Sequence, residues 1–408
     1  MDDAQLQDVL SLFNERMERL SRIYFRRMGE HIRHVGELLP SDTNRLIEMR
    51  RMNANLGAVQ RAIEREMGDT QDLVTRAFLK AAQEDSDFAR ALFGAEPTSV
   101  RRNPALMRLL RAQIRQTGGE IHNLSRTTVE SSAYRALLDD AIQAVTTGLT
   151  DYQSAIRSAL RVAGSQGLRI TYPSGATRRK VRSRRLDSAV RQNILDGARQ
   201  LTGQVMYETG QEFGADGVEL SAHPLCALDH LPYQGRQFSK AEFEALQREL
   251  ERPIGQWNCR HIAFPVLLGI SAPAHDEREL AAYRMNSEQL IEIGEARKTR
   301  YQWTQRQRQI ETAVRAQKDL AMAAQAAGDG YLRREAQRRI LELEAEYERI
   351  SQAAGLEPRF ERMRVEGFKD MSIRERTGTG STPQALPAAG GSGIIGYQAE
   401  QIKKTNRL

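Results

Sequence analysis

Apolar residues recur every three or four positions through most of the first 160 residues, with arginines and glutamates between them. This spacing places the apolar side chains on one face of a helix. The helical runs cover residues 6–39, 46–67, 73–93 and 103–160; Pro40 is expected to end the first, and Ser41-Asp42 can cap the second. The pattern predicts an antiparallel helical bundle or an oligomerising arm, and equally a plain helical domain with its own core.

The pattern changes after residue 165. Residues 167–172 alternate in the manner of a strand, and Pro173-Ser174-Gly175 is typical of a turn. A helix is expected over 186–213, a strand over 218–221, and a short helix over 239–252 with Ser239 and Glu242 as a capping box. The apolar run 266–270 closes this segment, which therefore has the mixed pattern of a small α+β domain.

Helical spacing returns at about His275. Two apolar stripes flank Gly328-Asp329-Gly330, a strong turn signal, and Gly355 can end the second helix. This predicts a helical hairpin whose narrow apolar seam would gain from packing on another subunit or domain. After Thr377 the chain is rich in Gly, Ser, Pro and Ala, a composition that predicts a flexible tail.

These patterns predict a mainly α protein with a small central α+β domain, an elongated helical N-terminal region and a C-terminal helical hairpin. The predicted domains are a helical N-terminal region, the α+β domain, the helical hairpin, and an extended segment with a flexible tail. They cover residues 1–165, 166–273, 274–355 and 356–408.

Composition narrows the function classes. The 28% of charged residues and 6% of aromatic residues suit elongated helices, and the net charge of +7 favours an acidic partner such as nucleic acid or an acidic protein surface. Two cysteines cannot form a disulfide framework, so a reducing compartment is expected. No apolar run is long enough to span a bilayer and the N-terminus lacks a secretory signal pattern, so no membrane partner is expected.

The densest basic cluster follows the predicted turn. It is a candidate surface for DNA phosphates or an acidic partner, because Lys and Arg neutralise phosphates regardless of sequence. The alternative is the solvated start of a helix. The cluster consists of Arg178, Arg179, Lys180, Arg182, Arg184 and Arg185.

Candidate chemistry concentrates between Ser221 and Pro265, which holds both cysteines and three of the seven histidines. These residues are candidate zinc ligands, since zinc sites commonly combine four such nitrogen and sulfur atoms. Their spacing matches no paired-knuckle pattern. The candidates are His223, Cys226, His230, Cys259 and His261.

Two other interpretations compete with the metal site. Cys259 could be a nucleophile with one of the histidines as its base. Alternatively, the polar side chains are buried and satisfied by backbone groups, and so fix loops around a small core supplied by Trp257 and Phe264. No P-loop, dinucleotide fingerprint, His-Glu-x-x-His or Gly-x-Ser-x-Gly is present, which favours the structural interpretation.

The same stretch closely resembles the signature of the phage minor capsid protein 2 family, within the broader phage head-morphogenesis proteins. The resemblance lies in Ser221-Ala-His223, in the segment from His230 to Phe238, and in Trp257-Asn258-Cys259-Arg260-His261 followed by Pro265. It extends to the Gln/Arg-rich segment 301–318 and, in character more than in letters, over most of residues 1–370. Cys226 is not part of the family pattern, which weakens a zinc site built on it.

The resemblance implies a structural protein of a tailed-phage head, and not an enzyme. It implies association with the portal protein and other head proteins at the portal vertex, several copies in the virion, and assembly in the host cytoplasm. It assigns portal binding or self-association to the helical N-terminal region and makes the central α+β segment the head-morphogenesis domain. It also implies non-specific contact with DNA, or ejection together with the DNA, as in some relatives. No cofactor is expected, and a metalloprotein or hydrolase built on the Cys/His residues is the alternative function. The structural motif positions are His223, His230, Gln234, Gly235, Trp257, Asn258, Cys259, Arg260 and His261.

Overall fold

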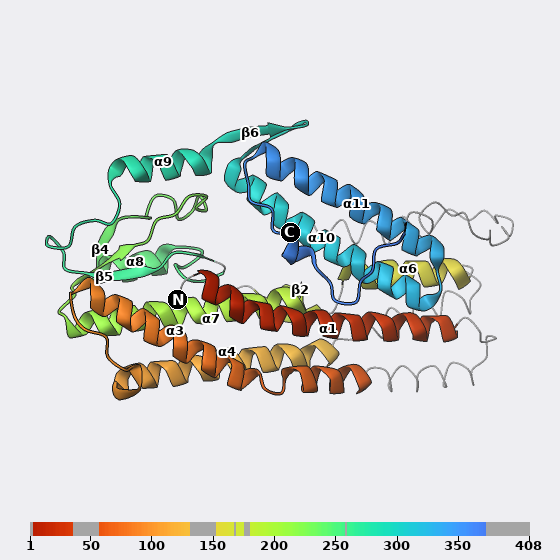
Figure 1. Cartoon of the computed structure of the whole chain (residues 1–408), viewed down its shortest axis with the longest axis horizontal. Coiled ribbons are helices and arrows are strands. Elements are labelled where there is room, and N and C mark those ends of the chain that lie inside the picture. The colour runs from red at the N-terminus through yellow and green to blue at the C-terminus, as the bar shows by residue number, and fades with distance from the viewer. Residues whose placement is uncertain are drawn as a thin grey trace. The chain divides into compact units, whose positions relative to one another are not determined.

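The computed structural model describes residues 3–35, 57–130, 152–166, 169–174, 180–257 and 259–372 (Figure 1). The predicted fold class is confirmed in being mainly α, with small antiparallel sheets in the middle of the chain and a C-terminal helical pair. The predicted tail after Thr377 and parts of the predicted helices, at 36–56 and 131–151, lie outside the described residues.

The N-terminal part consists of helices that pack on one another. They are α1 (Asp3–Val35), a helical stretch at 57–67, α3 (Thr70–Leu92), α4 (Pro104–Glu130) and α6 (Tyr152–Gln166), with the short η1 (Val100–Arg102) before α4. Arg16 pairs with Asp69, and Arg19 Nε lies 2.9 Å from Glu66 Oε2. These ion pairs join α1 to the chain around residue 67, so the predicted apolar stripes face a common core.

The helix α7 (Leu186–Glu212) lies at the centre of this core and packs against α1, α3 and α4. Its contact with α3 includes a buried hydrogen bond of 2.8 Å from Thr202 Oγ1 to Asp85 Oδ2. The core therefore combines helices from both sides of the predicted boundary at residue 165.

One small sheet precedes α7 along the chain and another follows it. The hairpin of β1 (Arg169–Ser174) and β2 (Lys180–Arg185) precedes it, so Lys180 to Arg185 form a strand and not the start of a helix. After it, β3 (Gly217–Leu220) is the central strand between β4 (Gln237–Ser239) and β5 (Ala263–Val266), and α8 (Lys240–Glu249) follows β4.

The predicted uninterrupted helical pattern after His275 is wrong over residues 290–299. α9 (Glu277–Glu288) ends before a hairpin of β6 (Leu290–Ile293) and β7 (Ala296–Thr299), in which Ile293 pairs with Ala296. The connection is the two residues Gly294-Glu295, and Gly294 has φ of 61°, which glycine adopts without a steric penalty. An alternating strand followed by a two-residue glycine turn is a hairpin signal that outweighs the helical period here.

The predicted helical hairpin is present as α10 (Arg300–Ala327) and α11 (Gly330–Ala353), which lie along each other in Figure 1. Gly328 ends α10 in the left-handed conformation, and Asp329 Oδ1 accepts the backbone N–H of Leu332 at 2.9 Å to begin α11. Between the two helices is a second core, which the 3-10 turn η2 (Phe360–Met363) also joins. Its largest fully buried side chain is Tyr347.

The hairpin also contributes to the first core, because Leu320, Ala323 and Leu332 pack there with α1 and α6. Arg157 of α6 forms an ion pair of 2.7 Å with Asp329 at the hairpin turn. The division into domains at residues 165, 273 and 355 therefore stays a prediction. The chain up to residue 370 packs as one compact unit. Among the described helices, none is long and apolar enough to cross a membrane.

Candidate functional site

Two loops of the central sheet bring the cysteines and histidines together. One loop joins β3 to β4, and the other precedes β5; Ser221 Oγ accepts the backbone N–H of Ile262 at 2.9 Å and so ties them to each other. Leu225 and Trp257 have φ of 58° and 50°, which few residues with a side chain adopt. These turns reverse the chain sharply, and they direct the side chains of both loops to one place.

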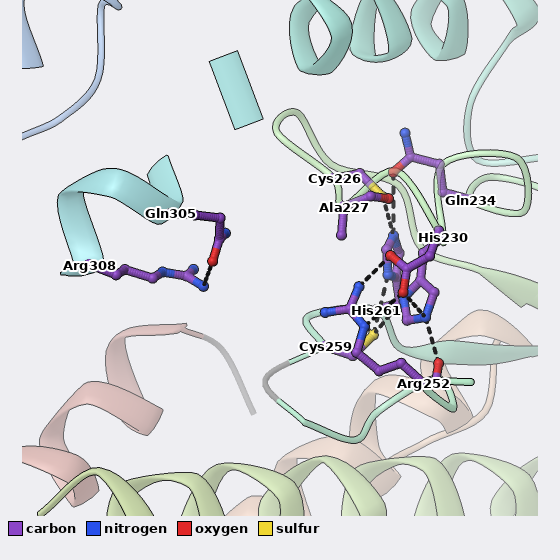
Figure 2. Close-up of polar contacts among 10 residues, drawn as sticks. Cys226, Ala227, His230, Gln234, Arg252, Cys259, His261, Gln305 and Arg308 are labelled. Atoms are coloured by element: carbon purple, nitrogen blue, oxygen red, sulfur yellow. Dashed lines mark hydrogen bonds and ion pairs between the residues drawn. The ribbon is translucent and has the colours of Figure 1, made fainter. Parts of the chain in front are cut away.

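At that place Cys259 Sγ lies 3.3 Å from His230 Nδ1 and 3.4 Å from His261 Nδ1 (Figure 2). The far ring nitrogen of His230 lies 2.7 Å from the carbonyl oxygen of Arg252. Nε2 of His261 lies 3.4 Å from Gln234 Oε1 and 3.5 Å from Cys226 Sγ. His230, Cys259 and His261 are all buried.

The fifth candidate, His223, lies at the edge of this cluster. Its ring centroid is 4.5 Å from that of His261, and its Nδ1 lies 3.0 Å from the carbonyl oxygen of Pro224. The structure therefore gathers all five candidates in one region, but only His230, Cys259 and His261 direct one ligand atom each to a common point.

The other motif positions have different surroundings. Gln234 Oε1 accepts the backbone N–H of His223 at 3.2 Å, and Gly235 has φ of 71° with Leu280 where a Cβ would be, 2.3 Å away. Arg260 is exposed, and Asn258 lies outside the described residues. Trp257 is 52% exposed, so the prediction that it supplies the small core is wrong; Leu220, Ile254 and Cys259 form that core.

Without a bound metal ion, burial determines the protonation of the cluster. It raises the pKa of the Cys226 thiol to about 12 and also raises the pKa of Cys259. It lowers the pKa of His261 to about 2, with the neighbouring histidines as a further cause, and lowers the pKa of His230. A nucleophilic cysteine needs a lowered thiol pKa, so these surroundings argue against Cys259 as a catalytic nucleophile.

Two adjoining cavities open beside the cluster. One, of about 260 Å³, is lined by His230, Cys259 and His261 and by Tyr301 of α10. The other, of about 270 Å³, lies between α1, α7, α10 and residues 359–365. Both cavities share Cys259, Arg260, Arg308, Glu311, Arg359 and Arg362.

We call the second cavity the arginine groove. It could not be predicted from the sequence. Its lining contains nine arginines and five acidic residues. Burial lowers the pKa of Arg191 to about 10, with the charges of Arg362 and Arg315 as further causes. No local sequence signal marks the groove, because its arginines come from segments far apart in the chain. They are Arg185, Arg191, Arg199, Arg260, Arg308, Arg315, Arg359, Arg362 and Arg364.

The predicted basic surface stays a prediction, because only one of its six side chains is described. Arg178 and Arg179 lie outside the described residues, as do the side chains of Lys180, Arg182 and Arg184 in β2. Arg185 is described, and it is buried with its Nη2 atom 2.6 Å from Asp319 Oδ2. Arg185 is therefore paired inside the protein, and it is not a candidate for the predicted phosphate-binding surface.

Replacing His230 with Ala is expected to destabilise the fold by about 2 kcal/mol, because the Arg252 carbonyl group would lose its buried donor. Urea denaturation of the purified chain measures this. His275→Ala is the matched control, since His275 is only partly buried and lies 3.5 Å from the exposed Glu279 carboxylate. Equal stability of the two variants would contradict a structural role for His230.

The comparisons with known proteins agree with the sequence motif. The family model for phage minor capsid protein 2 matches residues 3–349, which include the helical core, the Cys/His cluster and most of the helical pair. Neither a curated protein nor a solved structure matches the chain. Since the match covers most of its length, the chain belongs to the phage minor capsid protein 2 family and is a helical structural protein of the virion.

Proposed function

We propose that the protein acts in head assembly at the portal vertex, in several copies, and that its arginine groove contacts the phosphates of packaged DNA. Its portal and other head proteins are its proposed protein partners, and the host cytoplasm is the proposed place of assembly. Membership of a minor capsid family supports the head role. The arginine groove is the observation that carries the DNA contact.

The groove suits phosphate for two reasons. Arg191 and Arg308 form no ion pair with any carboxylate in the described part of the chain, so their charges are left for a ligand. Three arginines of the lining, Arg260, Arg308 and Arg364, are exposed to solvent, so a ligand can reach the groove. A cavity of about 270 Å³ is far smaller than a DNA duplex, so the contact is made with backbone phosphates and carries no sequence preference.

A salt series tests the DNA contact. Binding of the full chain to a fluorescent oligonucleotide should weaken steeply with salt, and the variant with both Arg191→Gln and Arg308→Gln should lose about one unit of log–log salt slope for each lost phosphate contact. The variant with Arg101→Gln and Arg102→Gln, two exposed arginines of η1, removes the same charge away from the groove.

The control variant should keep most of the salt slope. Equal slopes for the two double variants would assign the effect to net charge and remove the groove from the proposal. Binding that does not depend on salt would remove the DNA contact altogether.

Portal association has a separate test. Heads assembled with and without the portal protein are purified, and the amount of this chain per head is measured. We expect the chain to be absent from portal-less heads. The same amount in both kinds of head would contradict a place at the portal vertex while leaving the head role intact.

A further inference from the structure

The ligand atoms of His230, Cys259 and His261 have the spacing of a metal site. With Zn–S near 2.3 Å and Zn–N near 2.0–2.1 Å, a tetrahedral zinc site has a sulfur-to-nitrogen edge of about 3.5 Å. The two edges from Cys259 Sγ to the Nδ1 atoms are 3.3 and 3.4 Å. All three ligand atoms lie within 4.8 Å of one another.

Each imidazole is oriented by an oxygen on its far side. The Arg252 carbonyl oxygen can only accept, so the 2.7 Å contact requires a proton on Nε2 of His230 and leaves the Nδ1 lone pair facing Cys259. Gln234 Oε1 plays the same part for His261 at 3.4 Å, and the backbone N–H of His223 fixes the orientation of that amide. Such oxygen partners behind histidine ligands are typical of metal sites.

The sulfur atom is also prepared as a ligand. The backbone N–H of His261 donates to Cys259 Sγ at 3.4 Å, and such a donor stabilises a thiolate. Cys259 and His261 are two positions apart, in a segment that does not form a strand. The irregular chain after the Trp257 turn brings both side chains to the same side.

We propose that His230, Cys259 and His261 bind one zinc ion. One thiolate with two imidazoles favours zinc over hard cations such as Mg²⁺ or Ca²⁺, which prefer oxygen ligands. No fourth His, Cys, Asp or Glu in the described residues joins the group. Because all three ligands line the cavity of about 260 Å³, water or an anionic group from that cavity completes the site.

Cys226 provides an internal control. It is as buried as Cys259, but its Sγ atom faces Nε2 of His261, the ring nitrogen opposite to the proposed ligand atom. Its thiol lies 3.2 Å from the carbonyl oxygen of Ala227 and donates to it. Cys226→Ser should therefore keep the metal, whereas Cys259→Ser should lose it.

The test measures zinc in the full chain, purified without chelator or affinity metal, by elemental analysis. We expect roughly one zinc per chain in the wild type and in Cys226→Ser, and less than about a tenth in Cys259→Ser. Cobalt exchange gives a second readout that does not depend on the variants folding equally well. The wild-type and Cys226→Ser proteins should show a sulfur-to-cobalt charge-transfer band and the strong visible absorption of four-coordinate cobalt.

Three results would overturn the site. The first is wild-type protein that contains less than about a tenth of a zinc per chain after growth and dialysis with zinc. The second is a cobalt spectrum without the charge-transfer band, which would show that no cysteine is bound. The third is loss of zinc from Cys226→Ser together with retention in a folded Cys259→Ser, which would place the metal on the other thiol.

Discussion

Arg185→Ala is expected to lower the free energy of unfolding by about 3–5 kcal/mol, since it leaves a buried carboxylate without its partner. Arg185 and Asp319 have side chains 8% and 1% exposed, and they join the β2–α7 junction to α10. Even with Arg185 present, burial raises the pKa of Asp319 to about 6. Urea denaturation at neutral pH measures the loss.

The deficit should shrink as the pH falls. A carboxyl group whose folded pKa lies above its unfolded pKa binds more protons in the folded state, so its effect on stability becomes less favourable as the pH rises through that window. Without Arg185 this shift is larger, because the favourable charge of the arginine is gone. The Arg185→Ala protein should therefore lie closer to the wild type at about pH 5 than at about pH 8.

Two further variants separate charge pairing from loss of an arginine. Arg364→Ala removes an arginine that is 72% exposed and 4.0 Å from Glu18, and it should change stability by less than about 0.5 kcal/mol. Arg185→Met combined with Asp319→Leu replaces the pair with apolar side chains and should regain most of the loss. If Arg185→Ala were as mild as Arg364→Ala, the ion pair would not hold the two elements together.

Helix caps and turns could be predicted from the sequence, because each depends on a few neighbouring residues. The capping box at α8 forms as expected, with Ser239 Oγ accepting the Glu242 N–H at 3.2 Å and Glu242 Oε2 accepting the Ser239 N–H at 2.8 Å. The turn at Gly328 also occurs where glycine and aspartate predict it. In each case a few adjacent residues carry the whole physical requirement.

The candidate site depended on distances that the sequence does not contain. Arg185 and Asp319 are 134 residues apart, and His230 and Cys259 are 29 residues apart. The spacing of Cys259 and His261 matches no zinc-knuckle pattern, and their convergence with His230 depends on two loops that turn at the left-handed residues Leu225 and Trp257. Arg185 shows the same limit for charge, because it belongs to the densest basic cluster and yet its side chain is buried against Asp319.

Gly29→Ala is expected to destabilise the protein by about 3 kcal/mol, through a clash between α1 and α10. A Cβ atom at Gly29 would lie 2.4 Å from the carbonyl oxygen of Ala323 and 2.6 Å from the Cβ atom of Ala326. Both atoms belong to the body of α10, so neither can rotate away and the helices must separate. Urea denaturation measures the stability, and size-exclusion chromatography shows whether the variant stays compact.

Gly203→Ala is the matched control, because Gly203 also lies inside a helix and, apart from its chain neighbours and the backbone of its own helix, no heavy atom lies within 4 Å of its added Cβ. Alanine is the better helix former by about 0.5–1 kcal/mol, so this variant should be slightly more stable than the wild type. The sequence left open whether the first helix is an arm or part of a core. A Gly29→Ala protein as stable as Gly203→Ala would indicate that α1 does not pack on α10 and is available to a partner as an arm. The expected loss would instead require a portal contact to be made by the outer faces of the packed helices.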